Sequence, residues 1–300
     1  MTNGIPDNWA MTSGGMKTSP KGGLFQINSI DDGPTIASNF HIHFGSVEIT
    51  MQAAPGAGIV STYVMESMDL DEIDVEIIGS ETGRIQSNYF GKGNTTTYDR
   101  GEYHPVNSPQ TTFHTYKVDW KPDTTQWYVD GQLVRTLHYA DAVGGKNYPQ
   151  TPCNIRIGNW VAGHPGNNPG TIQWAGGLAN FNNAPFNMYV TKVNIQNYNP
   201  CAAYEYSDRS GDWRSIKCAS GPKSSASPSS KPVPTSTKTS TKQPITTSNE
   251  AAVTTSSSTS AVTYPVTSSK SSESPVYSSG SSISSEAPVT PTSSMTSPRP

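Results

Sequence analysis

The amino-acid sequence predicts an all-β domain built as a sandwich or jelly roll. Few windows place apolar residues at helical spacing, whereas segments of alternating apolar and polar residues follow one another closely. Turns rich in glycine and proline separate these segments, and Asp130-Gly131 is a strong two-residue hairpin signal. Many short strands of this kind are typical of two packed β-sheets.

The expected strands follow the alternation along the chain. Lys121-Pro122-Asp123 supplies the turn after the longest alternating run, and the next strand returns into the Asp130-Gly131 hairpin. The predicted strands cover residues 44–51, 58–66, 72–77, 111–120, 126–129, 133–137, 154–160 and 187–198.

Composition divides the chain of 300 residues into two unequal parts. Residues 1–219 contain all six tryptophans and all three cysteines, and we expect them to form one domain. Residues 220–300 are mainly Ser, Thr, Pro and Lys and have too little apolar surface to offset the entropy of ordering. We expect a disordered, O-glycosylated stalk there.

Charge excludes some partners. The net charge is −3, the charged fraction is 14%, and residues 1–219 contain no basic block, so we expect no binding to nucleic acid. A neutral polar polymer fits this composition better than a polyanion. No stretch is long and apolar enough to cross a bilayer, and no signal peptide opens the chain. The stalk and the Asn94-Thr95-Thr96 glycosylation sequon nevertheless favour an extracellular protein.

The three cysteines leave at least one thiol unpaired within the chain. Cys201 and Cys218 flank a segment rich in Tyr and Ser, and a disulfide between them would hold the last strand in place. Cys153 would then be a buried free thiol or would pair with a partner outside this chain.

The strand at residues 72–77 carries the strongest signal for chemistry. Alternation places Glu72, Asp74 and Glu76 on one face. The intervening apolar side chains point into the core: Ile73, Val75 and Ile77. An ordinary solvated acidic face is the simpler interpretation, although neighbouring like charges destabilise a strand.

A retaining glycosidase is the alternative interpretation of this face. Such enzymes need two carboxyl groups about 5–5.5 Å apart. Cα atoms four residues apart on a flat strand are separated by about 13 Å, so the side chains must lean together across a concave face. We expect Asp74 to bond to the nucleophile and to supply negative charge that raises the pKa of the acid. The spacing alone does not say whether Glu72 or Glu76 attacks.

The run Asp71–Glu76 resembles the ExDxE signature of glycoside hydrolase family 16. Longer blocks, among them NYFGKGNTTTYDRGEYHPV, PGTIQWAGG and YEYSDRSGDWRSIK, are similar to the Crh-type fungal cell-wall transglycosylases over residues 24–217. The resemblance implies a concanavalin-like jelly roll with an open cleft. It also implies that Glu72 is the nucleophile, Asp74 assists it, and Glu76 is the acid/base and contacts substrate.

The same resemblance implies cleavage of chitin and transfer of the new reducing end to β-glucan or chitin, outside the cell in the fungal wall. Members of the family begin with a signal peptide and carry cysteines ahead of the first strand, and many end in an apolar tail for a lipid anchor. The sequence shows none of these features, so any membrane contact would depend on an anchor not visible here. We expect a monomer.

Further candidates for sugar contact lie outside the acidic strand. Arg156, Gly158 and Trp160 share a face by alternation, and a polar and aromatic face with a glycine gap suits a pyranose ring. An ordinary exposed face is the other interpretation. Thr171 and Trp174 resemble sugar-contacting positions of the family.

Two further groups complete the list of candidate residues. Gln86 and Asn88 alternate after the acidic strand and could bind sugar hydroxyls. His41 and His43 also share a face and could bind a metal, although surface histidines are the expected outcome, and the chemistry requires no metal and no cofactor. Two tryptophans are expected in the core or at the rim of the cleft: Trp120 and Trp127.

Three functions are consistent with these residues. A transglycosylase passes the sugar from the enzyme to an acceptor hydroxyl, and a hydrolase passes it to water. A wall lectin on the same fold would need neither carboxylate, yet Glu72 and Glu76 are both present. The resemblance favours transfer.

Overall fold

The protein was examined as a computed structural model that describes residues 4–219. The expected stalk at 220–300 lies outside the described residues. Two seven-stranded antiparallel sheets pack face to face, which confirms the predicted all-β sandwich. Within the described part of the chain, no helix is long and apolar enough to cross a membrane.

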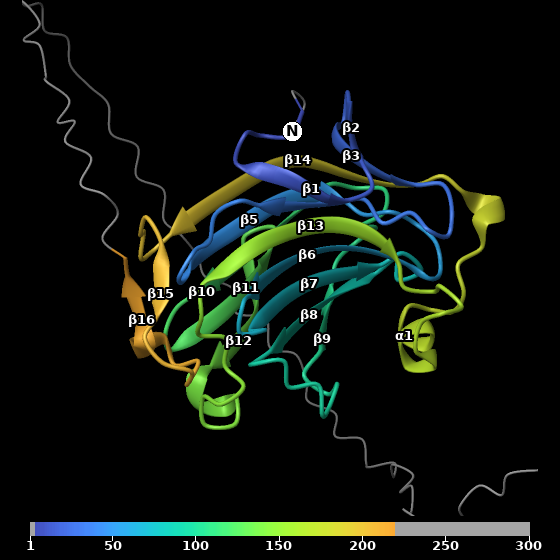
Figure 1. The fold of residues 1–300 in the computed structure, drawn as a ribbon. Helices are drawn as coiled ribbons and strands as arrows, with labels where there is room; N and C mark the ends of the chain where they lie inside the picture. Colours follow the sequence, from blue (N-terminus) through green and yellow to red (C-terminus); the bar gives the residue numbers. More distant parts are fainter. Residues whose placement is uncertain (1–3, 220–300) are drawn as a thin grey trace, which may run out of the picture. The chain divides into compact units, whose positions relative to one another are not determined.

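Sheet A carries the acidic strand near its middle, and its strands curve across the front of the molecule (Figure 1). From one edge to the other it contains β1 (Trp9–Ser13), β4 (Thr35–Ser38), β13 (Cys153–Val161), β6 (Ile59–Ser67), β7 (Glu72–Ile78), β8 (Arg84–Phe90) and β9 (Glu102–Pro105).

Sheet B covers the apolar face of sheet A. In spatial order it contains β12 (Gln132–His138), β11 (Thr124–Val129), β10 (His114–Trp120), β5 (Gly45–Gln52), β14 (Phe186–Asn197), β3 (Gly22–Ile27) and β2 (Met16–Ser19). Alternate residues of β5 and β10 are buried, as expected for strands with one face in a core.

The core between the sheets includes Trp120 and Trp127, which were predicted to lie either in the core or at the rim of the cleft. Trp120 and Trp127 are fully buried. The Trp120 indole N–H donates to the carbonyl of Pro149 (3.0 Å), and that of Trp127 donates to the carbonyl of Asp74 (3.1 Å). Each buried indole therefore has a hydrogen-bond partner, and Trp127 also ties sheet B to the acidic strand.

Each of the eight predicted segments coincides with an observed strand within a few residues. Eight further strands within residues 4–219 were not predicted: β1, β2, β3, β4, β8, β9, β15 (Tyr204–Tyr206) and β16 (Ile216–Cys218). Among the predicted segments, the start of β10 differs most. β10 begins at His114 because the amides of Thr111 and Thr112 donate to the carbonyl of Ser108 in a turn. Helix α1 (Pro169–Trp174) was not predicted, because its six residues are too few to show a helical repeat. Asn168 caps α1 by accepting from the amide of Gly170 (2.9 Å), and proline occupies its first position.

Opposite ends of sheet A are covered by different elements (Figure 1). Helix α1 lies at one end, and the hairpin of β15 (Tyr204–Tyr206) and β16 (Ile216–Cys218) lies at the other. The expected disulfide between Cys201 and Cys218 is present and closes this hairpin, and Cys153 is a buried free thiol.

Candidate active site

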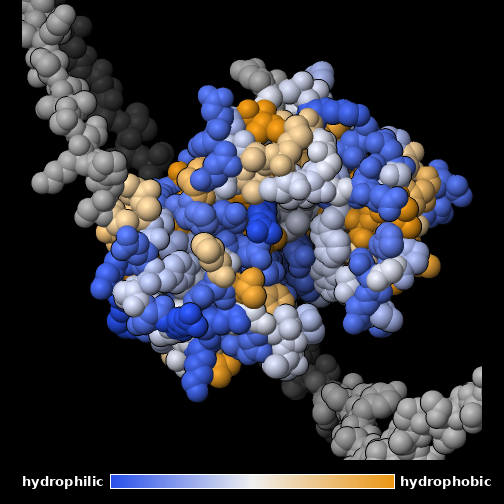
Figure 2. Space-filling model, viewed as in Figure 1, coloured by the Kyte–Doolittle hydropathy of each residue, from blue (hydrophilic) through white to orange (hydrophobic). Residues whose placement is uncertain are grey.

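The acidic face of β7 points away from the sandwich core. Ile73, Val75 and Ile77 are buried between the sheets, so their neighbours Glu72, Asp74 and Glu76 lie on the opposite face, as predicted. Glu72 and Glu76 are half-buried, whereas Asp74 is buried. The visible face of the molecule is mainly hydrophilic and is hollowed near its centre (Figure 2).

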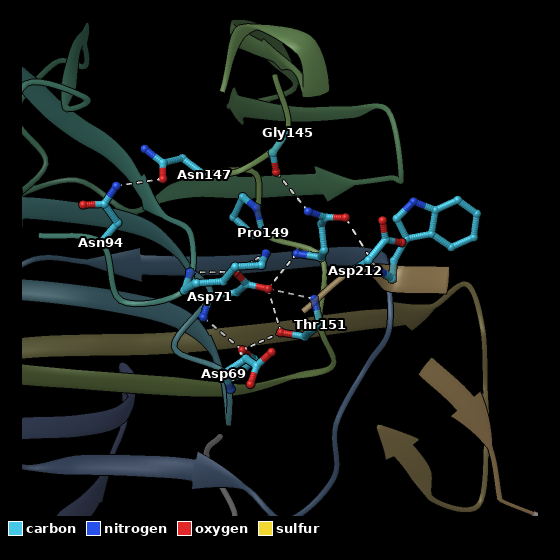
Figure 3. A network of polar contacts seen from close by, with 12 residues as sticks. Asp69, Asp71, Asn94, Gly145, Asn147, Pro149, Thr151 and Asp212 are labelled. Atoms are coloured by element: carbon cyan, nitrogen blue, oxygen red, sulfur yellow. Dashed lines mark hydrogen bonds and ion pairs between the residues drawn. The ribbon is translucent and has the colours of Figure 1, made fainter. Parts of the chain in front are cut away.

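A buried hydrogen-bond network fixes the start of β7 (Figure 3). Oδ2 of Asp71 accepts from the amides of Gln150 (2.8 Å) and Thr151 (2.9 Å) and from the Thr151 hydroxyl (2.6 Å). Its Oδ1 accepts from the amide of Lys92 (3.0 Å), whose ammonium lies 3.6 Å away. Asp71 is fully buried and directly precedes Glu72, so these bonds hold the backbone that carries Glu72.

The three acidic side chains differ in their tendency to hold a proton. Burial, followed by the charge of Glu72, raises the pKa of Glu76 to about 8. Burial also raises the pKa of Glu72, while a hydrogen bond from Asp74 and the charge of Arg156 act in the lowering direction. Burial and the charges of Glu72 and Glu76 raise the pKa of Asp74 well above its usual range.

These directions distinguish Asp74 from its two neighbours on the strand. A buried carboxyl between two others ionises least readily, so burial and its neighbours favour the protonated form of Asp74, and the charge of Glu72 contributes to the raised pKa of Glu76. A protonated Asp74 can donate to Glu72, and this bond favours the ionised form of Glu72. The expected contact between Asp74 and Glu72 is therefore consistent with the structure.

A fourth carboxyl group lies beside Glu72. Glu66 on β6 is directly opposite Glu72 in the strand register, and its Oε2 lies 2.7 Å from the Arg156 guanidinium. The charge of Glu66 adds to the effect of burial in raising the pKa of Glu72, whereas the charge of Arg156 lowers that pKa. Arg156 therefore lies on the acidic face as predicted, and it balances charge between two carboxyl groups.

The opposite end of the acidic strand is enclosed by polar and aromatic side chains. Gln86 pairs with Glu76 across β7 and β8, and its Oε1 accepts from the Trp174 indole N–H (3.1 Å). The rings of Trp174 and Trp160 lie 6.3 Å apart in a stacked arrangement. Thr171 lies on the same short helix as Trp174, one turn earlier. The structure therefore brings Gln86, Trp160 and Trp174 together beside Glu76.

Asn88 and Gly158 lie on the acidic face but are more enclosed than Arg156 and Trp160. Asn88 is opposite Asp74 in the register and is buried, and its Oδ1 accepts from the amide of Tyr89 (2.9 Å). A side chain at Gly158 would place its Cβ only 2.6 Å from Oγ1 of Thr35 on the neighbouring strand. The glycine gap is thus occupied by Thr35, and it is no recess for a sugar.

The histidine pair lies away from the acidic strand. His43 is buried, its Nε2 lies 3.1 Å from the carbonyl of Gln150, and its ring stacks on Phe44. His41 lines two surface hollows of ≈ 320 and ≈ 560 Å³ near Cys201. Residues 4–219 contain no group of three or more His, Cys, Asp or Glu that could hold a metal ion.

Sequence reasoning missed Glu66 and Asp71 as residues that shape this site, and it placed Trp127 only at the core or the rim. Glu66 reaches it only through strand pairing, which one sequence does not reveal. Trp127 comes from sheet B. Asp71 adjoins the acidic strand, and a charged residue next to a strand of alternating acids was the only signal available for it.

The fold and the acidic strand together define a jelly-roll enzyme of the glycoside hydrolase class, with two glutamates and an aspartate on one strand. Residues 6–176 match glycosyl hydrolases family 16, and the chain belongs to that family.

Several curated proteins are similar to this chain. Crh-like protein 1 of Aspergillus fumigatus is 55% identical over 215 residues, which cover 72% of this chain and 60% of that protein. Crh-like protein 5 of the same species is 52% identical over 211 residues, covering 70% of this chain and 53% of that protein. The chain therefore spans only about 53–60% of the length of these two relatives.

Solved structures show the same likeness. A Crh5 transglycosylase in complex with NAG has a TM-score of 0.70 and is 52% identical, with 71% of this chain and 88% of that chain covered. A Bacillus licheniformis β-glucanase has a TM-score of 0.53 and is 26% identical, covering 65% of this chain and 94% of that chain.

Proposed function

We propose that this protein is a retaining transglycosylase that cleaves chitin and transfers the new end to β-glucan or to another chitin chain. The observation that carries the proposal is the arrangement on β7: Glu72, Asp74 and Glu76 share one face, and burial with the charge of Glu72 raises the pKa of Glu76 to about 8. The likeness to a Crh5 transglycosylase that binds NAG supports chitin as the donor.

The proposed reaction has two steps. The Glu72 carboxylate attacks the anomeric carbon while Glu76 donates a proton to the oxygen of the departing sugar, leaving a covalent glycosyl-enzyme. Glu76, now ionised, then takes the proton of an acceptor hydroxyl, whose oxygen attacks the anomeric carbon and displaces Glu72. Asp74 keeps its proton throughout and donates to Glu72.

Other residues hold the substrate in this proposal. Arg156 and Trp160 contact the donor on the β13 side of the acidic strand, and Thr171 and Trp174 close the end near Glu76. No cofactor takes part. The polymer partners are uncharged, which agrees with the low charged fraction of the chain.

The proposal extends to the organisation and location of the protein. Residues 1–219 form the catalytic domain, and residues 220–300 form a Ser/Thr/Pro-rich stalk in the extracellular fungal cell wall. The stalk composition and the similarity to Crh-like proteins support this placement, and a monomer suffices because every proposed site residue lies in one chain.

The test uses chitin oligomers as donor and a fluorescent β-glucan or chitin oligosaccharide as acceptor. Labelled product of higher mass is expected with the native protein, and shortened oligomers alone would indicate a hydrolase. Glu72→Gln and Glu76→Gln should each abolish transfer while circular dichroism stays unchanged. Glu48→Gln is the matched control, because Glu48 forms an ion pair with Lys192 on sheet B. Full activity in either active-site variant would refute the assigned roles.

A further inference from the structure

An exposed aromatic ring continues the row of side chains that contains Glu76. Antiparallel register places Thr62, Glu76, Gln86 and Tyr103 directly opposite one another on β6, β7, β8 and β9. Paired residues of neighbouring strands project from the same face of a sheet, so the Tyr103 ring lies on the same side as the carboxyl of Glu76. The charge of Glu76 contributes to the raised pKa of Tyr103, which agrees with this proximity.

The Tyr103 ring is held in place and remains accessible. The Arg84 guanidinium lies 4.0 Å from the ring centroid, and Glu81 holds Arg84 through two hydrogen bonds of 2.9 and 2.8 Å. Tyr103 lies on the edge strand β9, and 41% of the residue is exposed. A ring that is fixed on one side and open on the other is ready to stack on a flat ligand.

The position between Glu76 and Tyr103 is occupied by a fixed amide. Oε1 of Gln86 accepts from the Trp174 indole, which sets the direction of its amide group. Gly101 passes so close that a Cβ there would lie 2.9 Å from Nε2 of Gln86. Gln86 is only 7% exposed, so it fixes the spacing between the acid/base Glu76 and the exposed ring of Tyr103.

This row extends to the side of β7 opposite that of Arg156 and Trp160. Both of those residues are on β13, beyond β6, whereas Gln86 and Tyr103 are on β8 and β9. If a glycan crosses the strands with its scissile bond over β7, the sugars on one side of that bond lie near β13 and those on the other side lie near β8 and β9. Donor sugars on the β13 side leave the β9 side for the sugar that departs and for the acceptor that replaces it.

We propose that Tyr103 is the platform for the acceptor sugar, a neutral β-linked pyranose, and that it sets the balance between transfer and hydrolysis. This inference rests on the proposed function. The apolar face of the sugar stacks on the ring, which places one of its hydroxyls beside Glu76. Glu76 takes its proton as the oxygen bonds to the anomeric carbon and the bond to Glu72 breaks. A sugar held there displaces water from the glycosyl-enzyme.

The experiment separates the two steps with a β-chitooligosaccharyl fluoride, whose leaving group places no sugar over Tyr103. Fluoride release then reports formation of the glycosyl-enzyme, and a fluorescent β-glucan or chitin oligosaccharide reports capture by the acceptor. The variants are Tyr103→Ala, Tyr103→Phe and, as a matched control, Tyr128→Ala. Tyr128 also packs beneath a cation, with the Lys117 ammonium 5.3 Å from its ring centroid, but it lies on sheet B.

Tyr103→Ala should raise the acceptor KM roughly five- to tenfold, as expected for the loss of one stacked aromatic contact. It should lower the ratio of transfer to hydrolysis and leave the donor KM and the rate of fluoride release within about twofold. Tyr103→Phe and Tyr128→Ala should both remain close to the native values. An unchanged acceptor KM in Tyr103→Ala, or an equal rise in the donor KM, would overturn the inference. Fluoride release by the native protein without any labelled product would overturn the proposed transfer itself.

Discussion

Removal of the Asp71 carboxyl tests whether the buried network in Figure 3 holds the catalytic strand in place. In Asp71→Ala, the backbone amides of Lys92, Gln150 and Thr151 lose their acceptor, and all three lie around a fully buried position. The Thr151 hydroxyl keeps a second contact with the Ser67 hydroxyl at 2.7 Å, so its loss is smaller.

The expected magnitude follows from the number of amides without a partner. A buried donor without an acceptor costs about 1–3 kcal/mol, and relaxation makes three such costs less than additive. We therefore expect the free energy of unfolding to fall by about 3–5 kcal/mol, a large share of the roughly 5–15 kcal/mol typical of a domain. Because Asp71 adjoins Glu72, we also expect kcat to fall more than the affinity for substrate.

Urea unfolding of the native protein and the variant measures this change, with an unchanged m-value showing that the same surface is exposed. Asp123→Ala is the matched control, because Asp123 is an exposed aspartate in the turn between β10 and β11. It should change the free energy of unfolding by less than about 1 kcal/mol. If Asp71→Ala costs no more than Asp123→Ala, the network does not support β7 in the way argued above.

Four further predictions concern the site and its surroundings. Because the pKa of Glu76 is raised from 4.5 in the unfolded chain to about 8, folding stability should fall as pH rises through that window. Glu76→Gln should reduce this slope in melting experiments and leave the part that comes from Glu72 and Asp74. The activity of the native protein should likewise decline above pH of about 8, where Glu76 has lost its proton, and a profile still rising there would contradict the assignment. Cys201→Ser should lower the free energy of unfolding by about 3 kcal/mol, because the disulfide closes a loop with a sequence separation of 17 residues in the unfolded chain. Urea unfolding measures this loss, and the reduced native protein should show the same loss. Gly158→Ala should lower the melting temperature through its contact with Thr35, and Thr35→Ala should partly restore it in the double variant; no recovery would mean that the cost has another origin.

Local patterns account for much of what could be predicted before the structure. Alternation located β5, β6, β7 and β13 within a few residues because each has one face in the core and one outside. Short elements such as α1 were missed, since six residues hold too few turns to establish a helical repeat. The start of β10 was placed too early because Thr111 and Thr112 favour strands locally, whereas a turn at Ser108 captures their amides.

The sequence by itself determined the strand with three carboxyl groups on one face, because that arrangement follows from the two-residue period of a β-strand. The tertiary structure decided how those groups divide a proton, since burial of Asp74 and the pairing of Glu66 with Arg156 depend on neighbouring strands. It also decided that Tyr103 extends the row of Glu76, as strand order and register arise only when distant segments pair.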